Sequence, residues 1–399
     1  MKLFIFSLFM ATFVFAEDFP ASTSSEAEFT KGFASDKGMQ DIDHKAVEAD
    51  RLKFGGSLQA EWQLYTLKNA PIKDVLYSPM TLELYLDSQL KDDVRAFFKG
   101  RMVHDASIDE TIPSPLTGLP QRKTTSFIDE MNLRFQTDHK IFWTIGTQKI
   151  KWGAAKFWNP TDFINLQKRD SLRQDDLRAG ISMLKAHIPW GDSNLYVIGV
   201  NENANESQQT GAAARFEIPF SKGEVSLSSY SRRGQNTKIG SDISFALGEF
   251  DLYVEAAESD TGHDKNISGG LTYEIMYSDD DSVIFGFESF WQENGTDDKT
   301  TYLATTLAGN YIPFYIGKKY DMASVFLTKP LSWNDSTFIL NMVQNSSDFS
   351  QYYRLNWVYT GMSDATWTTA VGGRSGSDDS EMKFLGQDLD AMIQVKVAF

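Results

Sequence analysis

The chain has 399 residues, no cysteine and a formal net charge of −16. The lack of cysteine excludes disulfides, thiolate metal sites, a cysteine nucleophile and a lipoprotein anchor, and the acidity argues against nucleic acid as a partner, because phosphate binding needs clustered lysine and arginine. The 29 Phe, 15 Tyr and 9 Trp in so polar a chain fit strands that have one apolar face.

The N-terminal segment, residues 1–16, reads MKLFIFSLFMATFVFA, in which Lys2 precedes an uncharged and mostly apolar run. This pattern is typical of a secretory signal peptide, because the apolar core is short for a permanent anchor. We expect cleavage after Ala16, and an uncleaved membrane anchor is the alternative. Residues 17–51 are acidic and rich in Ser and Ala without a sustained period, which predicts a periplasmic N-terminal extension or a plug for the domain that follows.

From residue 52 onward, segments of roughly ten residues alternate apolar and polar positions, the period of a strand that is wet on one side. Phe250, Leu252 and Val254, for example, interleave with Asp251 and Glu255. The same alternation is clear in 54–64, 82–87, 239–247 and 353–359. A soluble β-sandwich would give a similar pattern, so alternation alone does not decide between the two architectures.

The connections between these segments alternate in length. Tight turns are predicted at residues 91–93, 137–139, 220–224, 247–249 and 278–281. Longer polar connections lie between them, around residues 105–124, 152–178, 201–210, 257–267 and 292–300. Short turns on one rim and long loops on the other are typical of a transmembrane barrel, with the long loops outside. Several of the long loops are acidic, which suits bridging to lipopolysaccharide through divalent cations or, equally, simple solvation.

The C-terminal segment alternates strictly and ends on an aromatic residue. Its apolar positions include Ile393, Val395, Val397 and Phe399. This ending resembles the signal by which the barrel-assembly machinery recognises outer-membrane barrels, and an aromatic ring at a strand end belongs at the bilayer interface.

Together these features predict an all-β protein whose residues 52–399 form a transmembrane antiparallel up-and-down β-barrel. We expect about 18 strands, within a range of 16–20 and with an even number favoured. A barrel this wide cannot fill its interior with side chains and should hold water. The prediction is therefore a porin-like channel for passive diffusion of small hydrophilic solutes in the outer membrane of a Gram-negative bacterium, with no cofactor. Its expected partners are lipid, lipopolysaccharide, the assembly machinery and small solutes, and trimer or monomer stays open.

The most distinctive stretch is GTQKIKWGAAKFWNPTD, residues 146–162. It resembles a pattern in poorly characterised porin-like outer-membrane families, in which a strand ends in Gly-x-Gln, Trp-Gly follows, and Asn-Pro opens a long loop. The matching residues here are Gly146, Gln148, Trp152, Gly153, Asn159, Pro160 and Asp162. The resemblance implies a porin-like barrel and names no substrate.

The loop at about 154–178 carries opposed charges and is the candidate constriction. Folded inward, it would narrow a pore, and rows of basic and acidic groups would set a transverse field. An outward loop with solvated or ion-paired charges is the alternative. The candidate residues, including two lysines of the preceding strand, are Lys149, Lys151, Lys168, Arg169, Asp170, Arg173, Asp175, Asp176 and Arg178.

Polar residues on the strands are expected to line the lumen, because Arg or Lys facing lipid would cost about 2–4 kcal/mol at mid-bilayer. The candidates are Arg95, Lys99, Arg101, Glu130, Arg134, Glu274 and Arg354. A non-conducting structural or surface-interaction barrel is the main rival to a channel. An outer-membrane hydrolase is a weaker one, since it would need a positioned His–Asp pair, and the neighbours His104–Asp105 and His263–Asp264 point to opposite faces of a strand.

Overall fold

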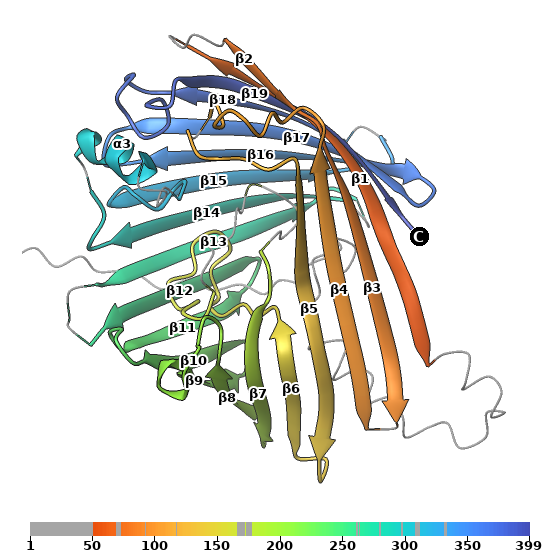
Figure 1. Cartoon of the computed structure of the whole chain (residues 1–399). Coiled ribbons are helices and arrows are strands. Elements are labelled where there is room, and N and C mark those ends of the chain that lie inside the picture. The colour runs from red at the N-terminus through yellow and green to blue at the C-terminus, as the bar shows by residue number, and fades with distance from the viewer. Residues whose placement is uncertain are drawn as a thin grey trace, which may run out of the picture.

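A computed structural model describes residues 51–399, apart from 69–72, 92, 117, 166–171, 173–177, 261, 263, 279–280, 297, 308–311 and 331–332. The expected signal peptide (1–16) and residues 17–50 of the expected extension lie outside the described residues. In the described part, each strand pairs antiparallel with the next one along the chain, and the last pairs with the first, so the sheet curls round and closes (Figure 1).

The strands are mostly eight to sixteen residues long, as the alternating segments predict. Their bounds are β1 (Leu52–Leu67), β2 (Asp74–Tyr77), β3 (Pro79–Lys91), β4 (Val94–Asp105), β5 (Thr124–Thr137), β6 (Ile141–Gln148), β7 (Ile181–Trp190), β8 (Ser193–Val200), β9 (Gly211–Phe220), β10 (Gly223–Arg232), β11 (Lys238–Leu247), β12 (Phe250–Ser259), β13 (Asn266–Met276), β14 (Ser282–Gln292), β15 (Lys319–Thr328), β16 (Ser336–Asn345), β17 (Ser350–Met362), β18 (Ala365–Ser375) and β19 (Gln387–Ala398).

The segments β2 and β3 form one interrupted strand. Both pair with β1 in a single register, in which Leu64 opposes Leu76 and Ala60 opposes Met80. Only Ser78 separates them, and its N–H donates to Asp105 Oδ1 at 3.1 Å. The described chain therefore forms a closed antiparallel barrel of 18 strands, which confirms the predicted fold class and strand number.

The barrel closes where β19 lies against β1. Eleven residue pairs join these strands, from Ser57 opposite Ala398 to Leu67 opposite Gln387. At the end of the seam the backbones of Gly56 and Phe399 exchange two N–H···O bonds, of 2.9 and 3.0 Å. The terminal aromatic residue thus belongs to the seam, and the sheet keeps no open edge there.

The outer face of the barrel is apolar and the inner face is polar, as period-2 alternation requires. On β12, Phe250 and Val254 point outward and are 40% and 48% exposed, whereas Tyr253 and Glu255 point inward and are buried. The outward belt continues around the barrel through exposed Leu58, Leu184, Val197, Leu227, Ile267, Phe285, Leu340, Leu355, Val371 and Ile393. This belt is the surface expected to meet hydrocarbon.

The two rims differ as predicted. Short connections, at residues 138–140, 191–192, 221–222, 248–249 and 363–364, lie on the rim where β1 begins and β19 ends. The opposite rim carries longer segments, at 106–123, 149–180, 201–210, 293–318 and 376–386. One of these contains the helix α3 (Lys299–Leu307), so this stretch adds no strand to the barrel. No helix in the described ranges is long and apolar enough to cross a membrane.

Candidate functional site: the lumen and its inward loop

The predicted basic residues of β4 and β5 lie on the inner wall as members of ion pairs. Arg95 Nε donates to Asp87 Oδ1 at 2.6 Å, and Arg101 Nη2 lies 3.0 Å from Asp129 Oδ1. Arg134 lies 3.9 Å from Glu130. The wall formed by β3, β4 and β5 therefore presents alternating charges rather than a run of one sign.

A β-bulge in β5 explains why two neighbouring acids both point inward. The register between β4 and β5 shifts after the pair Lys99–Glu130, so that Gly100 opposes Ile128 and Asp129 is the extra residue. Asp129 and Glu130 are both buried as a result. A strict two-residue period would have placed one of them toward lipid, and the bulge provides the alternative.

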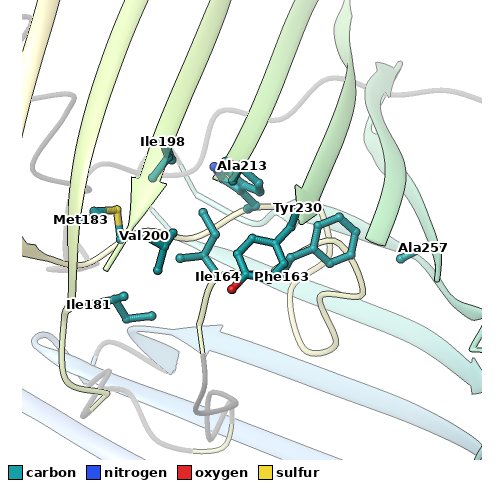
Figure 2. Packing of buried hydrophobic residues seen from close by; sticks show 10 residues of the cluster. Phe163, Ile164, Ile181, Met183, Ile198, Val200, Ala213, Tyr230 and Ala257 are labelled. Carbon is teal, nitrogen blue, oxygen red and sulfur yellow. The ribbon is translucent and has the colours of Figure 1, made fainter. Parts of the chain in front are cut away.

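The segment between β6 and β7, residues 149–180, is hereafter the lumen loop, and its described part from Trp152 to Ile164 lies inside the barrel. Of its described residues, Trp152, Phe163 and Ile164 are buried against the inner wall of β7–β12. Figure 2 shows Ile164 beside Val200 and Phe163 beside Tyr230 of that wall. Burial of apolar side chains in this position stabilises the inward course of the loop by about 1.5–3 kcal/mol for each large residue.

Two carboxylates of the inner wall, on β12 and β14, hold the backbone of the lumen loop. Glu288 on β14 accepts the N–H groups of Lys156, Phe157 and Trp158 at 2.9, 3.0 and 2.7 Å. Its remaining acceptor sites take the hydroxyls of Tyr253, at 2.7 Å, and Ser268, at 3.0 Å. Buried N–H groups need acceptors, and this single side chain supplies them for one turn of the loop.

Glu255, which lies on β12, holds the same loop from a second position. It accepts the N–H of Ala155 at 3.1 Å and the N–H of Thr161 at 3.0 Å. Glu255 and Glu288 are 0% and 2% exposed. Together the two carboxylates bind five backbone amides and fix residues 155–161 at a defined position inside the barrel.

A second apolar cluster completes the docking of the loop. Phe157 and Trp158 pack with Phe290, Tyr320 and Tyr352 of β14, β15 and β17. The Trp158 ring stacks on Phe290 with 5.6 Å between ring centroids, a distance typical of aromatic pairs. The cluster also takes in Met382 of the 376–386 loop, so two long segments of the same rim meet inside the barrel.

The 376–386 loop is held by a third buried carboxylate. Glu381 accepts the hydroxyl of Tyr320 and the side-chain amide of Asn345, both at 2.7 Å, and the N–H of Phe314 at 3.1 Å. Its own N–H donates to Asp348 at 2.7 Å. Burial raises the pKa of Glu381 to about 7, against the opposing effect of these hydrogen bonds.

The remaining predicted loop charges fall into two groups. Lys149 lies beside Glu130 and donates its N–H to it, and Lys151 Nζ donates to the Ala155 carbonyl at 3.2 Å. Arg178 forms a buried ion pair with Asp162 at 3.0 Å, which joins the C-terminal end of the loop to its middle. Six further candidates lie outside the described residues, namely Lys168, Arg169, Asp170, Arg173, Asp175 and Asp176.

The distinctive sequence motif, residues 146–162, leads the chain from β6 into the lumen and holds the lumen loop there. Gly153 has φ +96°, and a Cβ placed there would lie 2.2 Å from Glu255 Oε2, so only glycine fits. The Trp152 ring is buried near Arg215, and the side-chain amide of Asn159 donates to the Ala155 carbonyl at 2.7 Å. The motif residues thus serve the path of the backbone.

Glu255 and Glu288 were not identified as site residues from the sequence. Both occupy the polar phase of clearly alternating strands, so their inward direction was readable. Their loop partners lie about a hundred or more residues away in sequence. Nothing in a single sequence connects them with the loop.

The imagined His–Asp pair at His104 is not formed. His104 is exposed and its Nδ1 lies 2.8 Å from Thr124 Oγ1, whereas Asp105 is buried and accepts from Ser78 and Ser107. His263 lies outside the described residues. The described residues contain no group of three or more His, Cys, Asp or Glu arranged to hold a metal ion.

A closed barrel of 18 strands with an apolar belt, a charged inner wall and an inward loop is a porin-type architecture. The fold is similar to that of OccAB4 of Acinetobacter baumannii, with a TM-score of 0.60 and 10% identity over 88% of this chain and 98% of that chain. A BenF-like porin from Pseudomonas fluorescens Pf-5 gives a TM-score of 0.58 at 10% identity, over 88% and 99%. The outer membrane protein OpdK of Pseudomonas aeruginosa gives 0.55 at 10% identity, over 87% and 98%. No protein-family model and no curated protein matches the sequence.

Proposed function

We propose that this protein is a channel of the outer membrane of a Gram-negative bacterium through which small hydrophilic solutes diffuse passively. The observation that carries the proposal is the pairing of an apolar outer belt with an inner wall of charged and hydrogen-bonding side chains in a closed barrel. Such a wall keeps its hydration only if it encloses water. The similar solved structures, which include a porin, support this function.

The lumen loop is the proposed constriction. It is anchored against β7–β17, so the route left for a solute runs beside β19, β1 and β3–β5. That wall carries Arg95, Arg101, Arg134 and Glu130, and Lys149 lies beside it. In this proposal these charges, together with those of residues 168–178, set the field that a passing solute meets.

The remaining segments of the chain have proposed roles in export and assembly. Residues 1–16 are the proposed signal peptide and 17–51 an N-terminal extension or plug. The alternating segment with Ile393, Val395, Val397 and Phe399 is the proposed signal for the barrel-assembly machinery. The proposed partners are lipid around the apolar belt and lipopolysaccharide at the acidic loops. The proposed assembly is a homotrimer.

Conductance in planar bilayers tests the proposal. Purified mature protein should insert and give discrete current steps of uniform size, and proteoliposomes should swell in isotonic sugar. Protein that inserts fully, as judged by protease protection, yet gives neither steps nor swelling would favour the non-conducting barrel. Deleting residues 17–51 should raise the conductance if that segment is a plug and leave it unchanged if it is an extension.

A further inference from the structure

Six of the seven arginines on the described strands are paired with carboxylates. Six arginines project from described strands between the two rims, each with a carboxylate oxygen at 3.9 Å or less: Arg95, Arg101, Arg134, Arg215, Arg354 and Arg374. Arg232, at the long-loop rim, donates instead to the carbonyl oxygen of Glu202 at 2.8 Å. The positive charge of these six arginines is therefore matched locally by negative charge.

The pairs on β3 and β4 remain open to the lumen. Lys99 Nζ lies 3.0 Å from Glu83 Oε1, and these side chains are 27% and 23% exposed. Arg95 and Asp87 are 28% and 12% exposed. Each pair is diagonal across two neighbouring strands, so a solute passing this wall meets both signs of charge at each level.

The other arginines are less exposed to the lumen than Arg95. Arg215 lies between Asp242, at 2.6 Å, and Glu217, at 2.8 Å, and its side chain is 5% exposed. Arg354 and Arg374 share Asp390, at 3.3 and 2.8 Å. An incoming anion would have to displace a buried carboxylate from each of these groups, and the desolvation involved makes that unfavourable.

Further carboxylates have neutral donors as their hydrogen-bond partners. Glu255 and Glu288 bind backbone amides, and Glu61 accepts from the side-chain amides of Gln59 and Gln394. Residues 166–177 contain three basic and three acidic side chains, so their sequence adds no net charge. The potential of the lumen is thus expected to be neutral to negative, in keeping with the −16 charge of the chain.

We infer that the channel favours neutral and cationic small solutes and disfavours anions, and that Glu83 and Asp87 are the residues that set this preference. This inference rests on the proposed channel function, and it specifies neutral and cationic molecules as the class of solute that passes. Glu83 and Asp87 carry it because their cationic partners, Lys99 and Arg95, face the open side of the lumen. Removing the two carboxylates would take away the negative charge nearest to both cations and so make the potential that an anion meets more positive.

Three sugars of one size and different charge provide the test. Proteoliposomes are challenged with glucose, gluconate and glucosamine at about pH 6.5, where the amine is protonated. Glucose and glucosamine should enter at similar rates and gluconate about twofold or more slowly, as expected of a lumen without positive potential. The reversal potential in a KCl gradient should lie on the potassium side of zero.

The variant E83Q/D87N should reverse the order. Gluconate entry should rise to or above that of glucose, and the reversal potential should move toward the chloride equilibrium potential. The matched control is E258Q, which removes a carboxylate from the outer face of β12 and should change neither. Unaltered glucose entry shows that a variant barrel is assembled. If E83Q/D87N does not assemble, the relative entry of the three sugars and the reversal potential of the unmodified protein still test the charge preference.

Gluconate entering the unmodified channel faster than glucose, or a reversal potential on the chloride side of zero, would overturn the inference and leave the channel in place. Unchanged selectivity in an assembled E83Q/D87N barrel would remove Glu83 and Asp87 from it. The lack of entry by all three sugars would overturn the channel proposal and this inference with it.

Discussion

Replacement of Glu288 should free the lumen loop without opening the barrel. In E288A three backbone amides of the loop, two buried and one partly buried, lose their acceptor. Each such amide costs about 1–3 kcal/mol. Taking the lowest value for all three, a loss of about 3 kcal/mol changes the ratio of docked to undocked loop by roughly 100-fold.

The glutamine variant should have a smaller effect of the same kind. Glu288 receives five donors, three amides and two hydroxyls. A glutamine has one acceptor oxygen with two lone pairs, so E288Q leaves at least three donors unsatisfied. The expected order of loop displacement is E288A above E288Q above the unmodified protein.

Single-channel recording is the assay, because a displaced loop widens the constriction and makes it fluctuate. Both variants should show a larger mean conductance and more open-channel noise, with E255Q behaving alike because Glu255 holds two amides of the same loop. E258Q, on the opposite face of the same strand as Glu255, should match the unmodified channel. A folded E288A barrel with unchanged conductance and unchanged noise would refute the anchoring role.

Three further outcomes follow from the same contacts. G153A places a Cβ within 2.2 Å of Glu255 and requires φ +96° of an alanine. It should therefore raise the conductance in single-channel recordings, as E255Q does. A conductance equal to that of the unmodified channel would contradict this. Burial raises the pKa of Glu381 to about 7, above its ordinary value. Its contribution to docking of the 376–386 loop is therefore complete below the ordinary pKa and is lost as the pH rises through about 7. Channel noise should increase from about pH 6 to pH 8, and E381Q should abolish that increase. Deleting Phe399 removes both backbone bonds to Gly56 and should lower the amount of folded, heat-modifiable barrel in the outer-membrane fraction, whereas full yield would argue against an assembly role.

The barrel was predictable because its information is local. Whether a strand residue meets lipid or lumen follows from position modulo two, and Phe250, Val254 and Glu255 already show their faces in the sequence. Loop lengths gave the two rims in the same way. The predicted number of about 18 strands agrees with the barrel because residues 299–307 form a helix and add no strand.

The path of the lumen loop depends on contacts that are not local in the sequence. Its charged residues suggested a constriction, yet the contacts that fix it inside the barrel are made by uncharged backbone amides and aromatic rings. The acceptors, Glu255 and Glu288, lie on strands that follow much later in the chain. Local periodicity carries no information about such long-range pairs, and only the closed barrel brings them together.

The bulge at Asp129 is a second case in which local reasoning falls short. Alternation predicts that only one of Asp129 and Glu130 faces inward, and Glu130 was the residue predicted to line the lumen. The extra residue in β5 turns both inward, where Asp129 binds Arg101. A bulge changes the phase of a strand without any mark in its composition.

Cysteine scanning across one strand tests the central claim most directly, since the chain has no cysteine of its own. Lys99 and Phe98 are neighbours on β4, with Lys99 turned toward the lumen and Phe98 toward the outer belt. In intact outer membranes a small charged maleimide should label K99C rapidly and leave F98C unlabelled. Equal labelling of both positions, or labelling of F98C alone, would contradict a water-filled barrel with a lipid-facing exterior.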